Sequence, residues 1–422
     1  MLSLDLPTQQ AAEDGLGDHS GAVVAIDPSD GDVLALASKP EFDPAAFARG
    51  MSVREYAALA DDPDKPLLNR ALRGEYPSGS TIKPAIALAA LTYNVIDPYQ
   101  ALYCAGVFHL PGSSLVWREG KGGHHGPVDM QQAITRSCDV YFYGLASTLG
   151  VDRIDTFLSP FGYGRLTGID ISGEKPGLLP SPAWKKKYFK HPQDEVWFPG
   201  ETVNLGVGQG YLLVTPLQLA HVVGVIAERG RSFRPRLLIG TRDAHGHITQ
   251  LPPVQDAGVQ GVAQSSWDLV LAGMHGVTTC QNEPRFGQTC GTAYAAFRGA
   301  PYEAAGKTGT AQVYTVSRSQ RLSENKSERL RDHAWFIAFA PLDHPRIAVA
   351  VLVEHGGFGA AAAAPIARKV IDAYLLRQYA PAAAPSAAAP SVAAAHPPVS
   401  ASPAAAKPAP AHPNATALKE PQ

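Results

Sequence analysis

The sequence predicts an α+β fold in which strands from both ends of the chain form one antiparallel sheet. Two strand–turn–strand patterns carry this prediction, one over residues 21–26 and 33–38 and one over residues 334–340 and 347–354. Each pair is separated by a short segment rich in aspartate and proline, which is typical of a hairpin. Residues 302–313 add one more β-rich run, with glycines that allow close backbone approach. We therefore expect a five-stranded antiparallel sheet.

Helical periodicity fills the middle of the chain and returns near its end. Apolar side chains recur every three or four positions over residues 83–91, 130–149 and 216–228, which predicts helices there. Residues 365–374 show the same spacing, and we expect this helix to lie across the sheet. The middle of the chain, about residues 80–295, is then an all-helical subdomain inserted between the two halves of the sheet.

Composition sets the domain organisation and excludes some classes of function. Apolar residues make up 45% of the 422 positions and the net charge is −2, which suits a globular core and argues against a nucleic-acid binder. No apolar run is long enough to span a bilayer, and no signal-peptide pattern opens the chain. Alanine and proline dominate from residue 379 onward, so we expect a folded body over residues 1–378 and a disordered tail over 379–422.

Ser80 and Lys83 form the first motif suited to chemistry. Ser80 follows a turn containing proline and glycine, and Lys83 begins the helical run after it. Three residues along a helix are nearly one turn, so the two side chains share a face. A serine becomes a nucleophile when a base takes its proton, and a lysine of lowered pKa can be that base. Taken alone, the pair more often reflects a helix cap beside a solvated lysine.

A second motif with a lysine lies on the late strand, where residues 305–311 read Ala-Gly-Lys-Thr-Gly-Thr-Ala. The triplet Gly-Lys-Thr also ends a phosphate-binding loop, but Pro301 stands where that loop needs glycine and a strand follows in place of a helix. A strand lysine between glycines instead suits the edge of a cleft. Three side chains there can bind a carboxylate: Lys307, Thr308 and Thr310.

The order of the motifs along the chain is more informative than any one of them. Ser-x-x-Lys is followed by Ser137-Cys138-Asp139 and then by Lys-Thr-Gly, an order that marks acyl transfer by an active serine. With the further segments 161–164, 206–210, 215–218 and 331–333, the chain resembles the transpeptidase domain of class B penicillin-binding proteins, most closely penicillin-binding protein 2 of Gram-negative bacteria. The resemblance covers about residues 4–374. It implies the serine transpeptidase fold, a five-stranded antiparallel sheet flanked by helices with a helical subdomain.

The resemblance also implies a reaction, the D,D-transpeptidation that cross-links peptidoglycan during cell-wall elongation and maintains rod shape. Ser80 would attack the carbonyl between the last two D-alanines of a stem peptide, with Lys83 as general base. Ser137 would relay a proton to the leaving amine, aided by Lys83 and Lys307. The backbone N–H groups of Ser80 and Thr310 would form the oxyanion hole, while the carboxylate-binding positions are Thr308, Gly309 and Thr310. β-Lactams would acylate Ser80.

Asp139 departs from the common form of the family's second motif, which ends in asparagine. A carboxylate only accepts hydrogen bonds, whereas an amide also donates. Asp139 would therefore pair with Lys83 or Lys307 and raise the pKa of that lysine, which opposes its use as a base. Proteins of the penicillin-binding protein 2 group tolerate aspartate here.

A cluster of metal-binding residue types precedes the second motif: Cys104, Glu119, His124, His125 and Cys138. Thiolate, imidazole and carboxylate groups can hold zinc in a tetrahedral site. The spacing is not that of a zinc knuckle, so a Cys104–Cys138 disulfide or two inert buried thiols remain alternatives. The resemblance implies a structural zinc ion with the ligands Cys104, Glu119, His125 and Cys138.

The other two cysteines, Cys280 and Cys290, bracket a short polar loop. Nine intervening residues suit a local disulfide that stabilises the loop.

Partners and location follow from the resemblance alone. It implies an N-terminal membrane anchor that is not in this chain, a place at the periplasmic face of the inner membrane of a Gram-negative bacterium, and a glycosyltransferase partner in the elongation complex. The substrates would be peptidoglycan stem peptides, and catalysis would need no cofactor. Two alternatives share the three motifs, a serine β-lactamase that hydrolyses its acyl-enzyme and a β-lactam sensor domain.

Overall fold

The computed structural model describes residues 1–120, 123–313 and 328–377. The predicted tail over residues 379–422 lies outside these ranges, so the tail and the domain boundary before it stay predictions. Among the described residues, none of the helices combines the length and the apolar character needed to cross a membrane.

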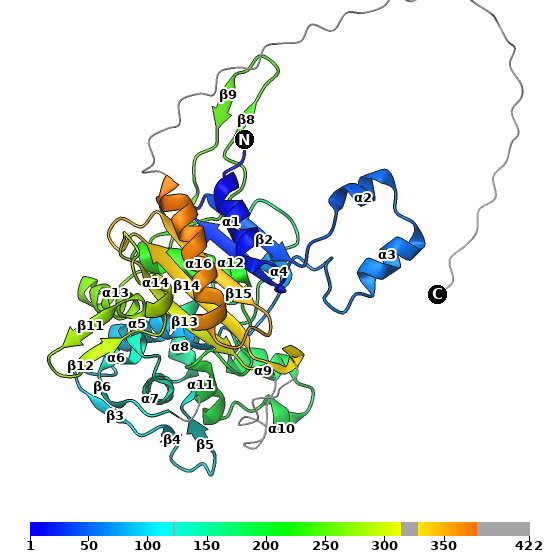
Figure 1. Ribbon diagram of the computed structural model, residues 1–422. Helices are drawn as coiled ribbons and strands as arrows, with labels where there is room; N and C mark the ends of the chain where they lie inside the picture. The colour runs from blue at the N-terminus through cyan, green and yellow to red at the C-terminus, as the bar shows by residue number, and fades with distance from the viewer. Residues whose placement is uncertain (121–122, 314–327, 378–422) are drawn as a thin grey trace, which may run out of the picture. The chain divides into compact units, whose positions relative to one another are not determined.

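Five antiparallel strands form the central sheet in the order β13-β14-β15-β1-β2 (Figure 1). Their bounds are β1 (Gly21–Ile26), β2 (Val33–Lys39), β13 (Ala305–Ala311), β14 (His333–Ala340) and β15 (Ile347–Val353). Pairing of β1 with β15 joins the two ends of the chain and places Gly21 opposite Val353. The predicted five-stranded antiparallel sheet is confirmed.

Helices cover both faces of this sheet. One face carries α1 (Leu6–Leu16) and α16 (Gly359–Leu375), which lie side by side in Figure 1, and the other carries α12 (Pro216–Ala227). Successive residues of a strand point to opposite faces, so Val23 packs in the core under α16 while Val24 packs in the core under α12. With both faces covered, β1 and β15 are fully buried and, apart from Leu352, consist of small and β-branched apolar residues.

The last helix is longer than the sequence predicted. It begins at Gly359, so Pro365 lies inside it and not at its first turn. The alanine-rich run before the proline has the highest intrinsic helix propensity and extends the helix toward its N-terminus.

The inserted subdomain between the two halves of the sheet is built mainly of helices. They include α5 (Lys83–Thr92), α6 (Met130–Thr135), α7 (Asp139–Leu149), α8 (Val151–Leu158), α9 (Pro182–Tyr188), α11 (Pro199–Leu205), α13 (Gln264–Thr278) and α14 (Tyr294–Phe297). Every residue of α5 from Lys83 to Ala90 is buried. Such a helix at the centre of the subdomain can position a side chain at its N-terminus firmly.

The expectation of an all-helical subdomain was too simple, because five short two-stranded sheets also lie between residues 102 and 290. They pair β3 (Leu102–Cys104) with β6 (Gly126–Val128), β4 (Val107–His109) with β5 (Val116–Arg118), β7 (Ser232–Phe233) with β10 (Gln255–Asp256), β8 (Gly240–Arg242) with β9 (Ile248–Gln250), and β11 (Cys280–Glu283) with β12 (Gly287–Cys290). Each strand has two to four residues, too few for a periodic pattern in the sequence. The predicted Cys280–Cys290 disulfide is confirmed and closes β11 against β12.

The single helix predicted over residues 130–149 is wrong at one position. The chain leaves α6 after Thr135 and re-enters a helix at Asp139. Between them Ser137 has a φ of 59°, a left-handed conformation that cannot continue an α-helix. The break turns the Ser137 carbonyl and hydroxyl out of the helical register, where both become available to other side chains.

Candidate active site

Ser80 lies in a short 3₁₀ helix, η1 (Gly79–Ile82), directly before α5. The preceding residue, Gly79, has a φ of 53° and donates its N–H to the Gly208 carbonyl at 2.9 Å. A Cβ atom on Gly79 would lie 2.5 Å from the Thr310 carbonyl oxygen. Only glycine fits between these two backbones, so the half-buried Ser80 is held against strand β13.

Lys83, the first residue of α5, is completely buried and joins the first motif to the second. Its Nζ donates to three oxygens: the Ser137 carbonyl at 2.8 Å, the Ser137 hydroxyl at 3.2 Å and the Asp139 carboxylate at 2.6 Å. None of the described residues hydrogen-bonds to the Ser80 hydroxyl. Lys83 and Asp139 therefore form one of the two ion pairs expected from the sequence, and this pair fixes the ammonium group against the second motif.

Lys307 brings the third motif to the same place from β13. Its side chain is completely buried, and its Nζ donates to the Ser137 hydroxyl at 2.8 Å and to the Thr308 carbonyl at 3.0 Å. Burial and the nearby charge of Lys83 lower the pKa of Lys307 well below its ordinary value, while the Asp139 carboxylate opposes this shift. The lowered pKa brings Lys307 closer to giving up a proton at neutral pH.

The other residues of the β13 motif, Thr308, Gly309 and Thr310, each make a different contact. Thr308 is 8% exposed, and its hydroxyl lies 2.8 Å from the Thr292 hydroxyl. The Thr310 carbonyl accepts a hydrogen bond from the Gln209 side chain at 3.1 Å. Gly309 serves close packing, because a Cβ atom there would lie 2.8 Å from the Thr81 methyl group. Gln209 belongs to a segment that carried the family resemblance, whereas no sequence signal pointed to Thr292.

The predicted metal ligands come together behind the second motif. The ligand atoms of Cys104, Glu119, His125 and Cys138 all lie within 4.8 Å of one another, and His124 is not among them. The two thiols are free, so the alternative of a Cys104–Cys138 disulfide is wrong. Glu119 Oε2 lies 3.5 Å from each sulfur, and His125 Nδ1 lies 3.6 Å from the Cys104 sulfur.

These separations and atom types fit a zinc ion. Metal–ligand bonds of about 2.0–2.3 Å in a tetrahedron place neighbouring ligand atoms roughly 3.3–3.8 Å apart. Burial lowers the pKa of His125 to about 4, so the imidazole is held in the neutral form that binds metals. Glu119 also accepts the backbone N–H groups of Asp139 and Val140 at 3.0 and 3.2 Å. The cluster is thus attached directly to the first turn of α7.

A buried ionic network around Tyr76, shortly before Ser80 in the chain, was not predicted from the sequence. The Tyr76 hydroxyl donates to Glu354 at 2.6 Å, and the Arg70 side chain contacts the same carboxylate oxygen at 3.1 Å. Burial raises the pKa of Glu354, but hydrogen bonds from Arg70 and Tyr76 outweigh it and the net pKa is lowered. The Trp335 indole donates to the Pro77 carbonyl at 3.0 Å. These contacts attach the segment that leads into Ser80 to the start of β14 and to the residue that follows β15.

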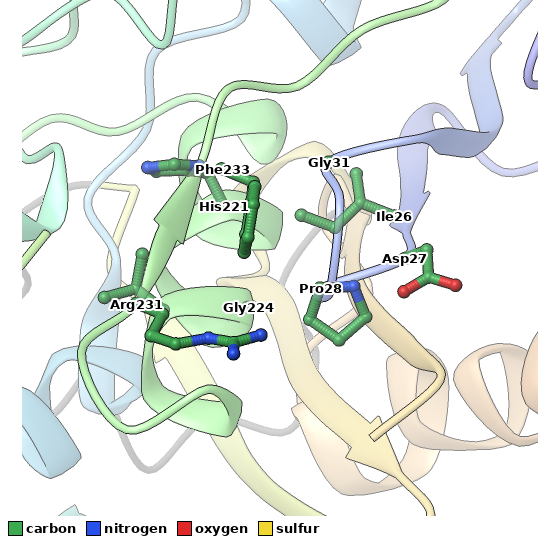
Figure 2. Close-up of a pocket in the computed structure, with 9 residues that line it drawn as sticks. Ile26, Asp27, Pro28, Gly31, His221, Gly224, Arg231 and Phe233 are labelled. Carbon is green, nitrogen blue, oxygen red and sulfur yellow. The ribbon is translucent and has the colours of Figure 1, made fainter. Parts of the chain in front are cut away.

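A small cavity of about 10 Å³ lies apart from these motifs, between the β1–β2 turn and α12. Figure 2 shows His221 and Phe233 on one side of it and Ile26 and Pro28 on the other. None of the residues that line it belongs to the three motifs. The space suffices for about one water molecule, so it is no substrate site.

Comparison with known proteins matches the motifs and the fold. The family model of the penicillin binding protein transpeptidase domain matches residues 21–372. The peptidoglycan D,D-transpeptidase MrdA of Salmonella typhimurium strain LT2 is 39% identical over 372 residues, which are 88% of this chain and 58% of that protein. MrdA of Acinetobacter baumannii is 40% identical over 376 residues, 89% of this chain and 53% of that protein. The chain thus spans little more than half the length of these relatives.

Solved structures of penicillin-binding proteins have a similar fold. PBP2 of Pseudomonas aeruginosa, in complex with WCK 5153, superposes with a TM-score of 0.77 at 41% identity and covers 92% of this chain and 78% of its own. PBP2 of Helicobacter pylori gives a TM-score of 0.75 at 29% identity over 90% of this chain and 64% of its own. The chain therefore belongs to the penicillin-binding protein transpeptidase family and is similar to its MrdA (PBP2) members.

Proposed function

We propose that this chain is a peptidoglycan D,D-transpeptidase that works through an acyl-enzyme on Ser80. The observation that carries the proposal is the convergence of Lys83 and Lys307 on the Ser137 hydroxyl. Ser80, three residues before Lys83, is half-buried, and its hydroxyl has no hydrogen-bond partner among the described residues. Acyl transfer needs a nucleophile, a base and a route by which the proton reaches the leaving group. The names of the MrdA relatives support the same reaction.

Acylation would proceed in two proton transfers. Ser80 Oγ attacks the carbonyl carbon between the last two D-alanines of a stem peptide, and its proton passes to Lys83 in the neutral state. The bond to the terminal D-alanine nitrogen then breaks, and that nitrogen receives a proton through the Ser137 hydroxyl. Both lysines already donate to this hydroxyl, so it is placed to exchange protons with either. The products are D-alanine and an ester on Ser80.

Stabilisation of the transition state would come from the backbone. The backbone N–H groups of Ser80 and Thr310 would form the oxyanion hole, which the close approach of Gly79 to the Thr310 backbone supports, and each donor of such a hole contributes roughly 3–4 kcal/mol. Thr308 and Thr310 on the edge strand would bind the substrate's terminal carboxylate. An amine from a neighbouring stem peptide then attacks the ester, which forms the cross-link and restores Ser80.

The mass of the intact protein after addition of benzylpenicillin tests this proposal. A β-lactam resembles the D-alanyl-D-alanine end, so we expect one stable adduct on the wild type and none on Ser80→Ala. Ser159→Ala, in a 3₁₀ helix away from the three motifs, is the matched serine control and should be acylated normally. Release of D-alanine and formation of a dimer from stem peptides would complete the assignment.

Other outcomes would contradict the proposal. Rapid loss of the adduct with steady hydrolysis of the drug would make the chain a β-lactamase. A stable adduct without any transfer to stem-peptide amines would make it a sensor. Absence of an adduct on folded protein would remove the active-serine assignment.

The cysteine cluster belongs to the same proposal as a structural zinc site. Cys104, Glu119, His125 and Cys138 would hold the ion. Bound zinc would supply a fixed cross-link between β3 and the start of α7, where Ser137 and Asp139 are presented. The reaction itself would use no cofactor.

The setting of the reaction would be the cell envelope. An anchor outside this chain would hold the domain at the periplasmic face of the inner membrane, next to a glycosyltransferase that supplies glycan strands. The solved complex of Helicobacter pylori PBP2 with MreC supports a role within an assembly of this kind.

A further inference from the structure

Thr292 is a hydroxyl-bearing residue outside the three motifs that contacts the edge strand of the active site. Its Oγ1 lies 2.8 Å from Oγ1 of Thr308, the threonine of the Lys-Thr-Gly motif. Thr308 is 8% exposed and Thr292 is partly buried. The two hydroxyls therefore meet where little water competes for either of them.

The position of Thr292 is set by the backbone on both sides of it. Gly291 donates its N–H to the Thr279 carbonyl and Ala293 donates to the Val277 carbonyl, each at 2.9 Å. A Cβ atom on Gly291 would lie 2.0 Å from the Gly276 carbonyl oxygen, so no other residue could approach the end of α13 this closely. Thr292 stands between these two anchors and has little freedom to move.

The same end of α13 also holds β13. The Thr278 hydroxyl donates to the Ala304 carbonyl, directly before the strand begins. The Cys280–Cys290 disulfide closes the hairpin that leads from α13 back to Gly291. Because Thr292 and Thr308 are both fixed to one helix end, their contact is built into the fold.

We propose that Thr292 is a positioning residue for recognition of the substrate's terminal carboxylate. A threonine hydroxyl has one proton, and a carboxylate can only accept. If Thr292 donates its proton to Thr308 Oγ1, the Thr308 proton stays free for the carboxylate. The three groups then form a chain of hydrogen bonds from Thr292 through Thr308 to the substrate, in which each bond strengthens the next. This inference rests on the proposed function, since it assumes that Thr308 meets a carboxylate.

The test compares Ser80 acylation by benzylpenicillin and by its methyl ester, which lacks the anionic carboxylate. Thr292→Val keeps the shape of the side chain and removes the donor, whereas Thr292→Ser keeps the donor. We expect Thr292→Val to lower the second-order acylation rate with benzylpenicillin roughly five- to tenfold. The rate with the ester should stay within about twofold of the wild type, and Thr292→Ser should restore both rates. In a saturation series the loss should fall on the dissociation constant, with the acylation step unchanged.

Thr279→Val is the matched control. Its hydroxyl donates to the His275 carbonyl at the same end of α13 and makes no hydrogen bond to the described residues of β13. It should behave as the wild type with both compounds. Equal losses with benzylpenicillin and the ester in Thr292→Val would mean a merely structural role and would overturn the inference, as would no loss with either. A wild type that neither compound acylates would instead overturn the proposed function, and the inference with it.

Discussion

Lys83 and Lys307 donate hydrogen bonds to the same oxygen, the Ser137 hydroxyl, at 3.2 and 2.8 Å. Both side chains are completely buried, and two ammonium groups this close repel each other strongly away from water. Asp139 distinguishes the two lysines, because its carboxylate forms an ion pair with Lys83. Lys307 lacks a direct carboxylate partner among the described residues, and its pKa falls well below the ordinary value. A single hydroxyl thus links a paired lysine to an unpaired one.

Replacing Asp139 by asparagine should shift the pH dependence of acylation. The Asp139 carboxylate raises the pKa of Lys307 against the effects of burial and of Lys83, so its loss lowers that pKa further. A neutral Lys307 is then reached at lower pH. We expect the acid limb of the acylation rate with benzylpenicillin to move to lower pH by about half a unit to one unit. An acid limb that stays in place, or moves upward, would mean that the Asp139 carboxylate does not control the lysine whose deprotonation limits acylation.

Removing the Ser137 hydroxyl should stop proton relay without unfolding the protein. Ser137→Gly relieves the strain of the left-handed backbone at this position, whereas Ser137→Ala keeps the Cβ and with it a strain of about 1 kcal/mol relative to glycine. We expect both variants to lose acylation by roughly 10²-fold or more, while only the alanine variant loses stability relative to the glycine variant. Acylation rates and urea denaturation of the two proteins would check this. Near-normal acylation of either variant would remove Ser137 from the reaction.

Elements that rest on local sequence patterns were predictable, whereas features that depend on contacts distant in the sequence were not. The sheet was predictable because β1 and β2 form a local hairpin, as do β14 and β15, and because their apolar runs are bounded by turn residues. Ser80, Lys83 and Lys307 were predictable as motifs. The break at Ser137 was not predictable, because the apolar spacing continues through it. The carbonyl of this left-handed residue accepts a hydrogen bond from Lys83, which is 54 residues away in the sequence.

Residues that act only through distant contacts left no mark in the sequence. Glu354 reaches Tyr76 across 278 positions, and nothing in the local pattern of β15 indicates an ionic partner. Thr292 contacts Thr308 from the far side of a disulfide-closed hairpin. Such pairs depend on tertiary packing, which periodicity and propensity do not describe.

Loss of the Glu354 carboxylate should destabilise the fold around the nucleophile. Arg70 is 2% exposed and faces Glu354, so Glu354→Gln leaves a buried guanidinium without its counter-charge. We expect the free energy of unfolding to fall by about 3 kcal/mol, with slower acylation because Tyr76 then donates to a neutral amide oxygen in place of a carboxylate. Asp268→Asn, which breaks the exposed ion pair with Arg229, should cost less than about 1 kcal/mol. Equal losses in the two variants, measured by urea denaturation, would contradict the buried network.

Metal analysis should find one zinc ion per chain in protein purified without added metal. In that state Cys104 and Cys138 should resist thiol reagents, and a strong chelator should make both react, because a thiolate bound to zinc is protected. Cys104→Ser should lower the zinc content and the melting temperature together. The disulfide pair Cys280 and Cys290 provides an internal control, since it should stay unreactive throughout. Zinc content near zero with two freely reactive thiols would rule out the site.

The buried histidine of α12 should make stability fall as the solution becomes acidic. His221 lines the small cavity of Figure 2, and its Nε2 lies 3.3 Å from the Ser232 hydroxyl. Burial lowers its pKa from 6.5 to about 4 in the folded protein. Above pH 6.5 the histidine is neutral in both states and its effect is complete. Between pH 6.5 and 4 only the unfolded chain takes up the proton, so the folded state loses about 1.4 kcal/mol per pH unit in this window.

His221→Gln keeps a polar acceptor near Ser232 and removes the titration. We expect the drop in unfolding free energy between pH 7.5 and pH 5 to be smaller in this variant by about 2 kcal/mol, because other titrating groups contribute equally to both proteins. His245→Asn, at an exposed histidine of the β8–β9 hairpin, should leave the drop unchanged. Urea denaturation at the two pH values measures all three proteins. A variant at His221 with the same drop as the wild type would mean that this imidazole takes up its proton inside the folded core at its ordinary pKa.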